Sequence, residues 1–205
     1  MSKKTATKGR KTRAQSKLDT RDALIETGMV LFAKEGLDGP SLDAICEHAG
    51  FTRGAFYVHF RDRDDFLVAV MDRVGTQLLD RLLTPSEGGL PALMARFLEA
   101  CRTGEYPLMP AGGVRPYQLF DACARSPLLR ERYLAFVKMC TSRVAELVRD
   151  GQQRGMLRKD VDPQRCGTLV LSAILGAQAL LDLGSPLALE ELALELLNLL
   201  GPREA

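Results

Sequence analysis

Residues 50–60, "GFTRGAFYVHF", place polar and small side chains directly before a dense group of four aromatic residues and a histidine. Thr52 offers a hydroxyl, Arg53 offers a cation with several hydrogen-bond donors, and Gly54 and Ala55 add almost no bulk. A buried helix would not need the polar residues, and a solvated loop would not need the aromatic ones. The segment therefore predicts a short helix with one face buried and its N-terminal end offered to a partner.

Two short helices joined by a tight turn account for this segment. One is expected over residues 41–49 with Ser41 as its N-cap, and the other over 53–60 with Thr52 as its N-cap. Gly50 supplies the positive φ that the turn between them requires. The pattern is typical of a helix-turn-helix, whose second helix enters the major groove of DNA by its N-terminal end. The predicted contacts are Thr52, Arg53, Gly54 and Ala55 with base edges, and Tyr57 and His59 with the sugar-phosphate backbone.

The stretch from about residue 21 to residue 70 resembles the N-terminal domain of TetR-family transcriptional repressors. The resemblance runs through "ALIETGMVLFAKEG" and "PSLDAICEHAGFTRGAFYVHFRDRDDFL", in which a G-x-F-Y-x-H-F core is followed by a basic residue and an acidic pair. The second half resembles the family more loosely, through "GQQRGMLRKDVDPQRCG" at residues 151–167. The resemblance implies a homodimer that binds a palindromic operator in double-stranded DNA, with a variable ligand-binding domain formed by the later helices.

Transferred residue by residue, the resemblance also implies individual DNA contacts. Phosphate contacts are implied for Ser41, Tyr57, His59 and Arg63, and base contacts for Thr52 and Arg53. Asp43 departs from the family pattern, since many members carry a basic or neutral residue at that position.

The N-terminal end carries most of the positive charge of the chain. Residues 1–21 hold eight lysines and arginines against Asp19 alone, a local charge of +7 that leaves −5 on the remainder of a chain with net charge +2. We expect residues 1–20 to form a basic arm that is disordered in isolation and drawn to nucleic acid. A solubilising tail explains the composition equally well.

Almost everything after the arm has helical periodicity, which predicts an all-α protein of about nine helices and no strand. Residues 21–67 would form a three-helix DNA-binding domain with the helix-turn-helix at 41–60, and residues 68–205 would form a helical ligand-binding and dimerisation domain. A long fourth helix is expected after Asp62, which stands as its N-cap. Three later helices are predicted to begin at a cap residue followed by proline: Ser126-Pro127, Asp162-Pro163 and Ser185-Pro186.

The second half offers little for catalysis. It contains no histidine and no glycine-rich phosphate loop, so we expect no enzyme and no cofactor. The five cysteines are widely spaced with no C-x-x-C pair and only two histidines are available, so no metal site is expected; buried thiols are favoured over a redox sensor. The absence of a long apolar run or a signal peptide favours a cytoplasmic protein without a membrane partner.

Methionine, cysteine and aromatic residues are instead predicted on the inward faces of the later helices. They would line a cavity for an apolar or aromatic ligand, although each could equally be ordinary core. The predicted ligand-binding residues are Met71, Phe97, Cys101, Tyr117, Phe120, Phe136 and Cys140. Ser172, Gly176 and Ala179 form a line of small residues on an apolar helix and are predicted to lie in the dimer interface.

Three functions remain open at this point. The favoured one is a ligand-responsive repressor, the second is a constitutive DNA-binding regulator without an effector, and the third is a helical protein that binds or converts a small molecule without binding DNA. The segment at 50–60 argues against the third, and the apolar second half argues mildly against the second.

Overall fold

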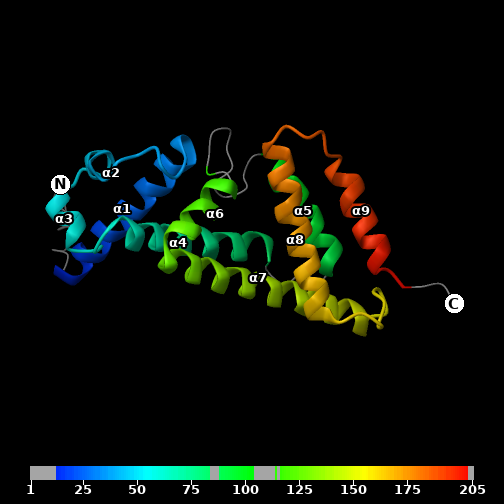
Figure 1. The fold of residues 1–205 in the computed structure, drawn as a ribbon. Coiled ribbons are helices and arrows are strands. Elements are labelled where there is room, and N and C mark those ends of the chain that lie inside the picture. Colours follow the sequence, from blue (N-terminus) through cyan, green and yellow to red (C-terminus); the bar gives the residue numbers. More distant parts are fainter. Residues whose placement is uncertain (1–12, 84–87, 104–113, 115, 203–205) are drawn as a thin grey trace, which may run out of the picture.

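The computed structural model describes residues 13–83, 88–103, 114 and 116–202. Over these residues the chain forms nine helices and no strand, which confirms the predicted all-α class (Figure 1). The helices are α1 (Arg13–Glu35), α2 (Leu42–Ala49), α3 (Arg53–Tyr57), α4 (Arg63–Leu82), α5 (Gly89–Thr103), α6 (Pro116–Arg125), α7 (Pro127–Gln153), α8 (Pro163–Asp182) and α9 (Leu189–Leu200).

The first three helices and the start of α4 surround one apolar core at one end of an elongated molecule (Figure 1). Phe32, Phe56 and Phe66 are fully buried there, and their rings pack at tilted or edge-on angles with centroids 5.3–6.1 Å apart. Such aromatic pairs add directional contacts to the burial of apolar area. This core fixes the angle at which α3 is presented.

Local hydrogen bonds place the starts of the two short helices, and the turn between them, where the sequence predicts them. The Ser41 hydroxyl accepts the Ala44 N–H at 3.1 Å at the start of α2, and the Thr52 hydroxyl accepts the Ala55 N–H at 3.2 Å at the start of α3. Gly50, between them, has φ of 75°. Both predicted N-caps and the predicted turn glycine are therefore confirmed.

The later helices form a second apolar core at the other end of the molecule. It is built mainly from α5, α7, α8 and α9 (Figure 1). The helices α7 and α8 approach closely, since a Cβ added to Gly167 would lie 2.6 Å from the Thr141 carbonyl oxygen. Glycine at 167 therefore lets the two helix backbones pack closely.

The helix α4 connects the two cores and is tied to both sides by ion pairs. Arg73 of α4 bonds Asp22 at 2.7 Å and also Glu26, both on α1. On its other side, Arg132 of α7 donates to both carboxylate oxygens of Asp72, at 2.5 and 2.9 Å. The position of α4 therefore depends on α1 and on α7 together.

Three predicted boundaries are wrong. The helix predicted over residues 53–60 ends at Tyr57. The arm predicted over residues 1–20 is helical from Arg13 onward, because residues 13–20 are mostly good helix formers and a Gln15–Asp19 hydrogen bond of 3.1 Å links successive turns; residues 1–12 lie outside the described part. The helix predicted to begin at Ser185-Pro186 begins at Leu189. Ser185 instead donates its N–H to the Leu180 carbonyl and so completes the end of α8.

Candidate nucleic-acid interface

The helix α3 has one buried face and one exposed face. Phe56 is 0% exposed, whereas the neighbouring Tyr57 is 48% exposed. Thr52, Arg53 and Gly54 are also exposed, and Ala55 is half-buried. The start of the helix therefore forms a polar, low-relief surface that a DNA groove can approach.

Gly54 lies at the most open position of this surface. A Cβ added there would meet only the Thr52 hydroxyl oxygen, at 3.7 Å. Because neither Gly54 nor Ala55 projects beyond the helix backbone, α3 can approach a flat surface closely. The hydroxyl groups of Ser41 and Thr52 act as caps through their oxygen atoms, and each retains a proton to donate.

Arg53 is held by residues from two helices. Its Nη1 atom lies 3.2 Å from both carboxylate oxygens of Asp43 on α2. Its Nη2 atom makes a long hydrogen bond of 3.5 Å with the Tyr57 hydroxyl, and the guanidinium lies 5.9 Å from the centre of the Tyr57 ring. The arginine predicted to contact a base therefore has a defined position before any DNA is bound.

His59 lies half-buried beside the N-terminal part of α1. Its burial, followed by the positive charges of Lys17 and Arg21, lowers the pKa of His59 below its ordinary value of 6.5. Arg21 also lies 5.2 Å from the centre of the Phe60 ring. At neutral pH this corner therefore presents a neutral imidazole next to two cations.

Lys17 and Arg21 are the members of this corner that the sequence alone does not single out. Both fall within the charge of the predicted basic arm, and α1 places them four residues apart on one helix face. Their spacing of four residues could have identified Lys17 and Arg21 from the sequence, because two residues at that spacing share one face if residues 13–20 are helical.

The structure corrects the expectation for Arg63. This residue was predicted to contact phosphate, but its side chain is half-buried and turned into the protein. Its guanidinium donates to the carbonyl oxygens of Pro40 at 2.8 Å and Leu37 at 2.6 Å, and it lies over the Phe32 ring. Burial accordingly lowers the pKa of Arg63. Its observed role is to hold the start of α4 against the connection between α1 and α2.

The residues predicted to bind a ligand do not gather in one place. Phe97 and Cys140 are buried in the C-terminal core, where burial raises the pKa of the Cys140 thiol to about 12. Met71 packs against the N-terminal core, and Cys101 and Phe136 pack at the margin of the C-terminal one. Tyr117 and Phe120, predicted to face inward, are 63% and 45% exposed. That orientation was wrong because α6 buries its opposite face, through Ala122 and Cys123.

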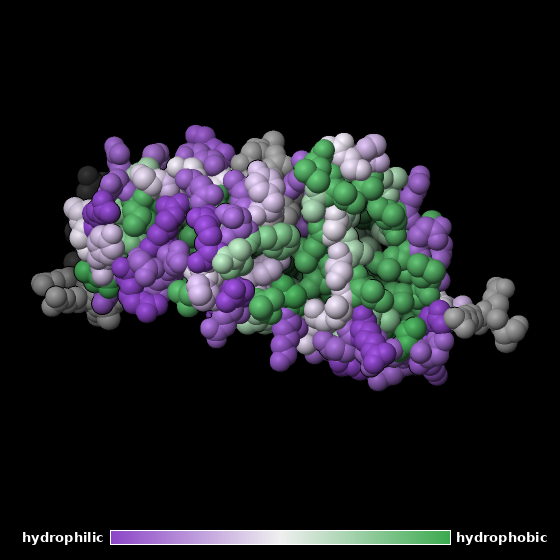
Figure 2. All heavy atoms as spheres, in the orientation of Figure 1, coloured by the Kyte–Doolittle hydropathy of each residue, from purple (hydrophilic) through white to green (hydrophobic). Residues whose placement is uncertain are grey.

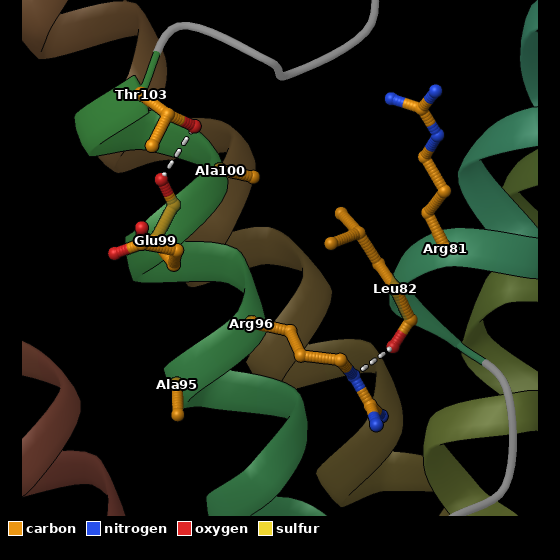
Figure 3. Close-up of a pocket in the computed structure, with 7 residues that line it drawn as sticks. All are labelled: Arg81, Leu82, Ala95, Arg96, Glu99, Ala100 and Thr103. Carbon is orange, nitrogen blue, oxygen red and sulfur yellow. Dashed lines mark hydrogen bonds between the residues drawn. The ribbon is translucent and has the colours of Figure 1, made fainter.

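An open pocket of about 670 Å³ lies instead where the end of α4 faces α5 (Figure 3). The Nε atom of Arg96 donates to the Leu82 carbonyl oxygen at 3.2 Å, and Arg81 adds a second guanidinium from α4. The carboxylate of Glu99 points away from Arg81 and is bonded by Arg102. The lining residues are Arg81, Leu82, Ala95, Arg96, Glu99, Ala100 and Thr103. None of the seven predicted ligand-binding residues is among them.

The helices α8 and α9 present a broad apolar surface (Figure 2). Ser172 and Gly176 are exposed on it and Ala179 is half-buried. A Cβ added to Gly176 would have no neighbour within 4 Å. Exposed leucines on these two helices and the link between them are Leu169, Leu180, Leu183, Leu192, Leu194 and Leu199.

Other kinds of site have little support in the part of the chain that the structure describes. No group of three or more His, Cys, Asp or Glu side chains is placed there to hold a metal ion. By length and composition alone, α8 could cross a membrane. One such helix is weak evidence, because an apolar helix that packs against protein meets the same criterion.

Comparison with known protein families gives two matches that follow the two halves of the fold. Residues 24–70 match the family described as "Bacterial regulatory proteins, tetR family". Residues 89–195 match the family described as "Tetracyclin repressor-like, C-terminal domain". The first match contains α2 and α3, and the second contains the apolar helix α8.

Individual relatives agree with these matches. The chain is 40% identical over 62 residues to the uncharacterized HTH-type transcriptional regulator TtgW of Pseudomonas putida, and the match spans 30% of this chain and 46%, less than half, of that protein. It is 24% identical over 169 residues to the HTH-type transcriptional regulator UidR of Escherichia coli (strain K12), and this match spans 78% of this chain and 80% of UidR.

A similar fold occurs in the crystal structure of the reduced form of E. coli NemR. The TM-score is 0.75 at 22% identity, and the superposition covers 91% of this chain and 99% of that one. At this identity the likeness concerns the fold alone. The two family matches together cover both the DNA-binding half and most of the second half of the chain. This protein therefore belongs to the TetR family of transcriptional regulators and carries the family's DNA-binding domain at its N-terminal end.

Proposed function

We propose that this protein is a sequence-specific repressor that binds a palindromic operator as a homodimer and is released by a small ligand. In each protomer the start of α3 enters the major groove, with Thr52 and Arg53 at base edges and Tyr57 and His59 at the backbone. The observation that carries the proposal is the two-faced α3, whose aromatic residue Phe56 is buried while its polar start is exposed. Such a regulator acts in the cytoplasm.

The proposed dimer is supported by the apolar surface of α8 and α9. Monomeric proteins rarely leave so many large apolar side chains exposed on adjacent helices, and a second copy would cover them. The line of Ser172, Gly176 and Ala179 would let two α8 helices approach closely, because small side chains keep the backbones near one another. A two-fold dimer matches the symmetry of a palindromic operator.

Ligand release is proposed to act through α4. The pocket lies at the C-terminal end of α4, beside Arg81 and Leu82. At the N-terminal end of the same helix, Arg63 holds α4 against the DNA-binding domain. A ligand in the C-terminal domain that shifts α4 would lower operator affinity by a coupling free energy of about 1–3 kcal/mol, and DNA would weaken ligand binding equally. We expect an apolar or aromatic compound that also carries a polar group, since the pocket combines the apolar Leu82, Ala95 and Ala100 with the guanidinium groups of Arg81 and Arg96.

Selection of bound DNA from a random pool tests the first part of the proposal. The wild-type protein should select a palindromic consensus. Arg53→Ala should relax the preference at one position in each half-site, because a bidentate contact between arginine and guanine is worth about 1–3 kcal/mol of discrimination. If the consensus is unchanged and affinity alone falls, Arg53 contacts phosphate and its assignment to a base is wrong.

A reporter gene under the selected operator then distinguishes repression from activation. Its expression should fall when the protein is produced and rise again when an effector is added. A constitutive regulator without an effector, the alternative, would remain bound in a gel-shift assay with every compound of a small-molecule library.

A further inference from the structure

Asp43 and Arg53 form an ion pair between the two helices of the helix-turn-helix. The side chains of both residues are exposed, at 68% and 55%, and Nη1 of the arginine lies 3.2 Å from each carboxylate oxygen. An exposed pair of this kind contributes little to folding, because water screens the two charges and both side chains lose freedom when they pair. Its placement therefore matters more for what Arg53 can bind than for the stability of the fold.

The pair restricts the directions in which Arg53 can reach. A long arginine at the edge of a DNA-binding surface can bind phosphate of any sequence, because its guanidinium is always charged and can swing on a flexible stem. Here one end of the guanidinium is bonded to Asp43 on α2 and the other end faces Tyr57 on α3. The guanidinium is thus held along the exposed face of α3, between Asp43 on α2 and Tyr57 at the end of α3. In the proposed complex this face of α3 lies in the groove.

Asp43 also penalises the wrong sequences. A carboxylate at the DNA surface repels phosphate, and its bond to Arg53 has to be replaced by an equally good one if the arginine moves. Guanine offers two acceptors to a guanidinium in the major groove, whereas other bases in that position offer a poorer match. Because Asp43 competes for Arg53, it weakens binding to non-cognate DNA more than binding to cognate DNA. The difference between the two affinities, which is the specificity, therefore increases.

We infer that Asp43 is a positioning residue that sets base specificity through Arg53, keeping the guanidinium on a base edge and away from phosphates. This inference rests on the proposed function. The proposed role explains why residue 43 carries a carboxylate, although a basic or neutral residue there would bind phosphate better.

The test compares variants by selection from a random pool and by binding of the consensus and of single-base substitutions. Asp43→Ala should reduce discrimination at the position that Arg53 reads by about five-fold or more, the lower end of the value of one bidentate base contact. It should also bind non-cognate DNA more tightly and with a steeper salt dependence, since the released arginine reaches phosphate. Asp43→Asn, which keeps the shape and removes the charge, should change discrimination in the same direction.

Glu47→Ala is the matched control, because it removes the same charge from an exposed position one turn further along α2. It should leave the base preference intact. The double variant Asp43→Ala/Arg53→Ala should discriminate no less than Arg53→Ala alone, since Asp43 acts through the arginine.

The inference is overturned if Asp43→Ala leaves the wild-type consensus unchanged, if Glu47→Ala relaxes it equally, or if the double variant discriminates clearly less than Arg53→Ala. A wild-type protein that selects no consensus overturns the proposed function itself, and this inference with it. Circular dichroism of each variant should match the wild type, because both carboxylates are exposed.

Discussion

Arg63 illustrates how the role of one side chain depends on the atoms around it. It follows the aromatic core of the helix-turn-helix and begins α4, where the family resemblance suggests a phosphate contact. In the structure it bonds two main-chain carbonyl oxygens and lies over Phe32. Which way a long side chain turns depends on acceptors 23 and 26 residues away in the sequence, and no local pattern encodes those.

His59 makes the proposed complex sensitive to pH. In the absence of DNA its pKa lies below 6.5, because of burial and of Lys17 and Arg21 nearby. A DNA phosphate beside it would favour the charged imidazolium and raise the pKa of His59 in the complex. Each protomer would then take up a proton on binding, so operator affinity should increase as the pH falls through the range between the two pKa values, by at most about tenfold per pH unit for each protomer of the dimer.

Titration of operator affinity between about pH 7.5 and 5.5, the range in which imidazoles change charge, checks this prediction. His59→Gln should flatten the pH dependence. His48→Gln is the control and should retain it, because the other histidine of the chain is on α2 and bonds the Ala44 carbonyl oxygen at 2.8 Å. Equal pH dependence in His59→Gln and wild type would remove His59 from the phosphate contacts.

At the scale of elements, the sequence predicted helix starts better than helix faces. Ser41, Thr52, Asp62, Ser126 and Asp162 each cap a helix in the predicted place, since a cap is a hydrogen bond over three residues and needs no tertiary information. The inward face of α6 was wrong because it is decided by the packing of α6 against α7 and the N-terminal core. Tyr117 and Phe120 proved exposed for that reason.

Two glycines on α8 lie in different surroundings, one at a contact within the protomer and the other on the surface that the proposed dimer would cover. Gly167 touches the α7 backbone, whereas Gly176 faces open space. Gly176→Arg should therefore leave the protomer folded and abolish the dimer, because burying the unpaired charge in the proposed interface costs more than the remaining apolar contacts can offset.

Sedimentation and circular dichroism measure the two effects separately. The expected result for Gly176→Arg is a helical monomer without operator affinity. Leu134→Arg places the same charge at an exposed leucine of α7 and should stay dimeric. If Gly176→Arg sediments as a dimer and binds its operator normally, the interface lies elsewhere.

At the scale of the whole molecule, the division of labour between the two ends was predictable, but the link between them was not. Glycines, caps and aromatic spacing identify the DNA-binding end, and apolar periodicity identifies the helical C-terminal half. The ion pairs that join α4 to α1 and α7 involve residues about 50–60 positions apart, such as Asp72 and Arg132. Pairings over that distance arise only from the folded arrangement.

Charge on the N-terminal arm should affect binding to all DNA sequences alike. Because α1 begins at Arg13, a deletion of residues 1–12 removes Lys3, Lys4, Lys8, Arg10 and Lys11 and leaves α1 intact. Affinity should fall and the slope of log affinity against log salt should become flatter, by about 0.9 for each phosphate that the arm no longer neutralises, with the consensus unchanged. Replacing the five cations by glutamine at full length should give the same result. A slope that stays unchanged in both variants would make the arm a solubilising tail.

The helix α4 has 20 residues, which at 1.5 Å per residue makes a rod about 30 Å long. A rod of that length works as a lever: a tilt of about 5° at one end moves the other end by roughly 2.6 Å. That displacement is about the length of a hydrogen bond, so it is enough to break a phosphate contact at the surface of α3. A ligand would need to change the angle of α4 only slightly, without unfolding any element, for its effect to reach the DNA.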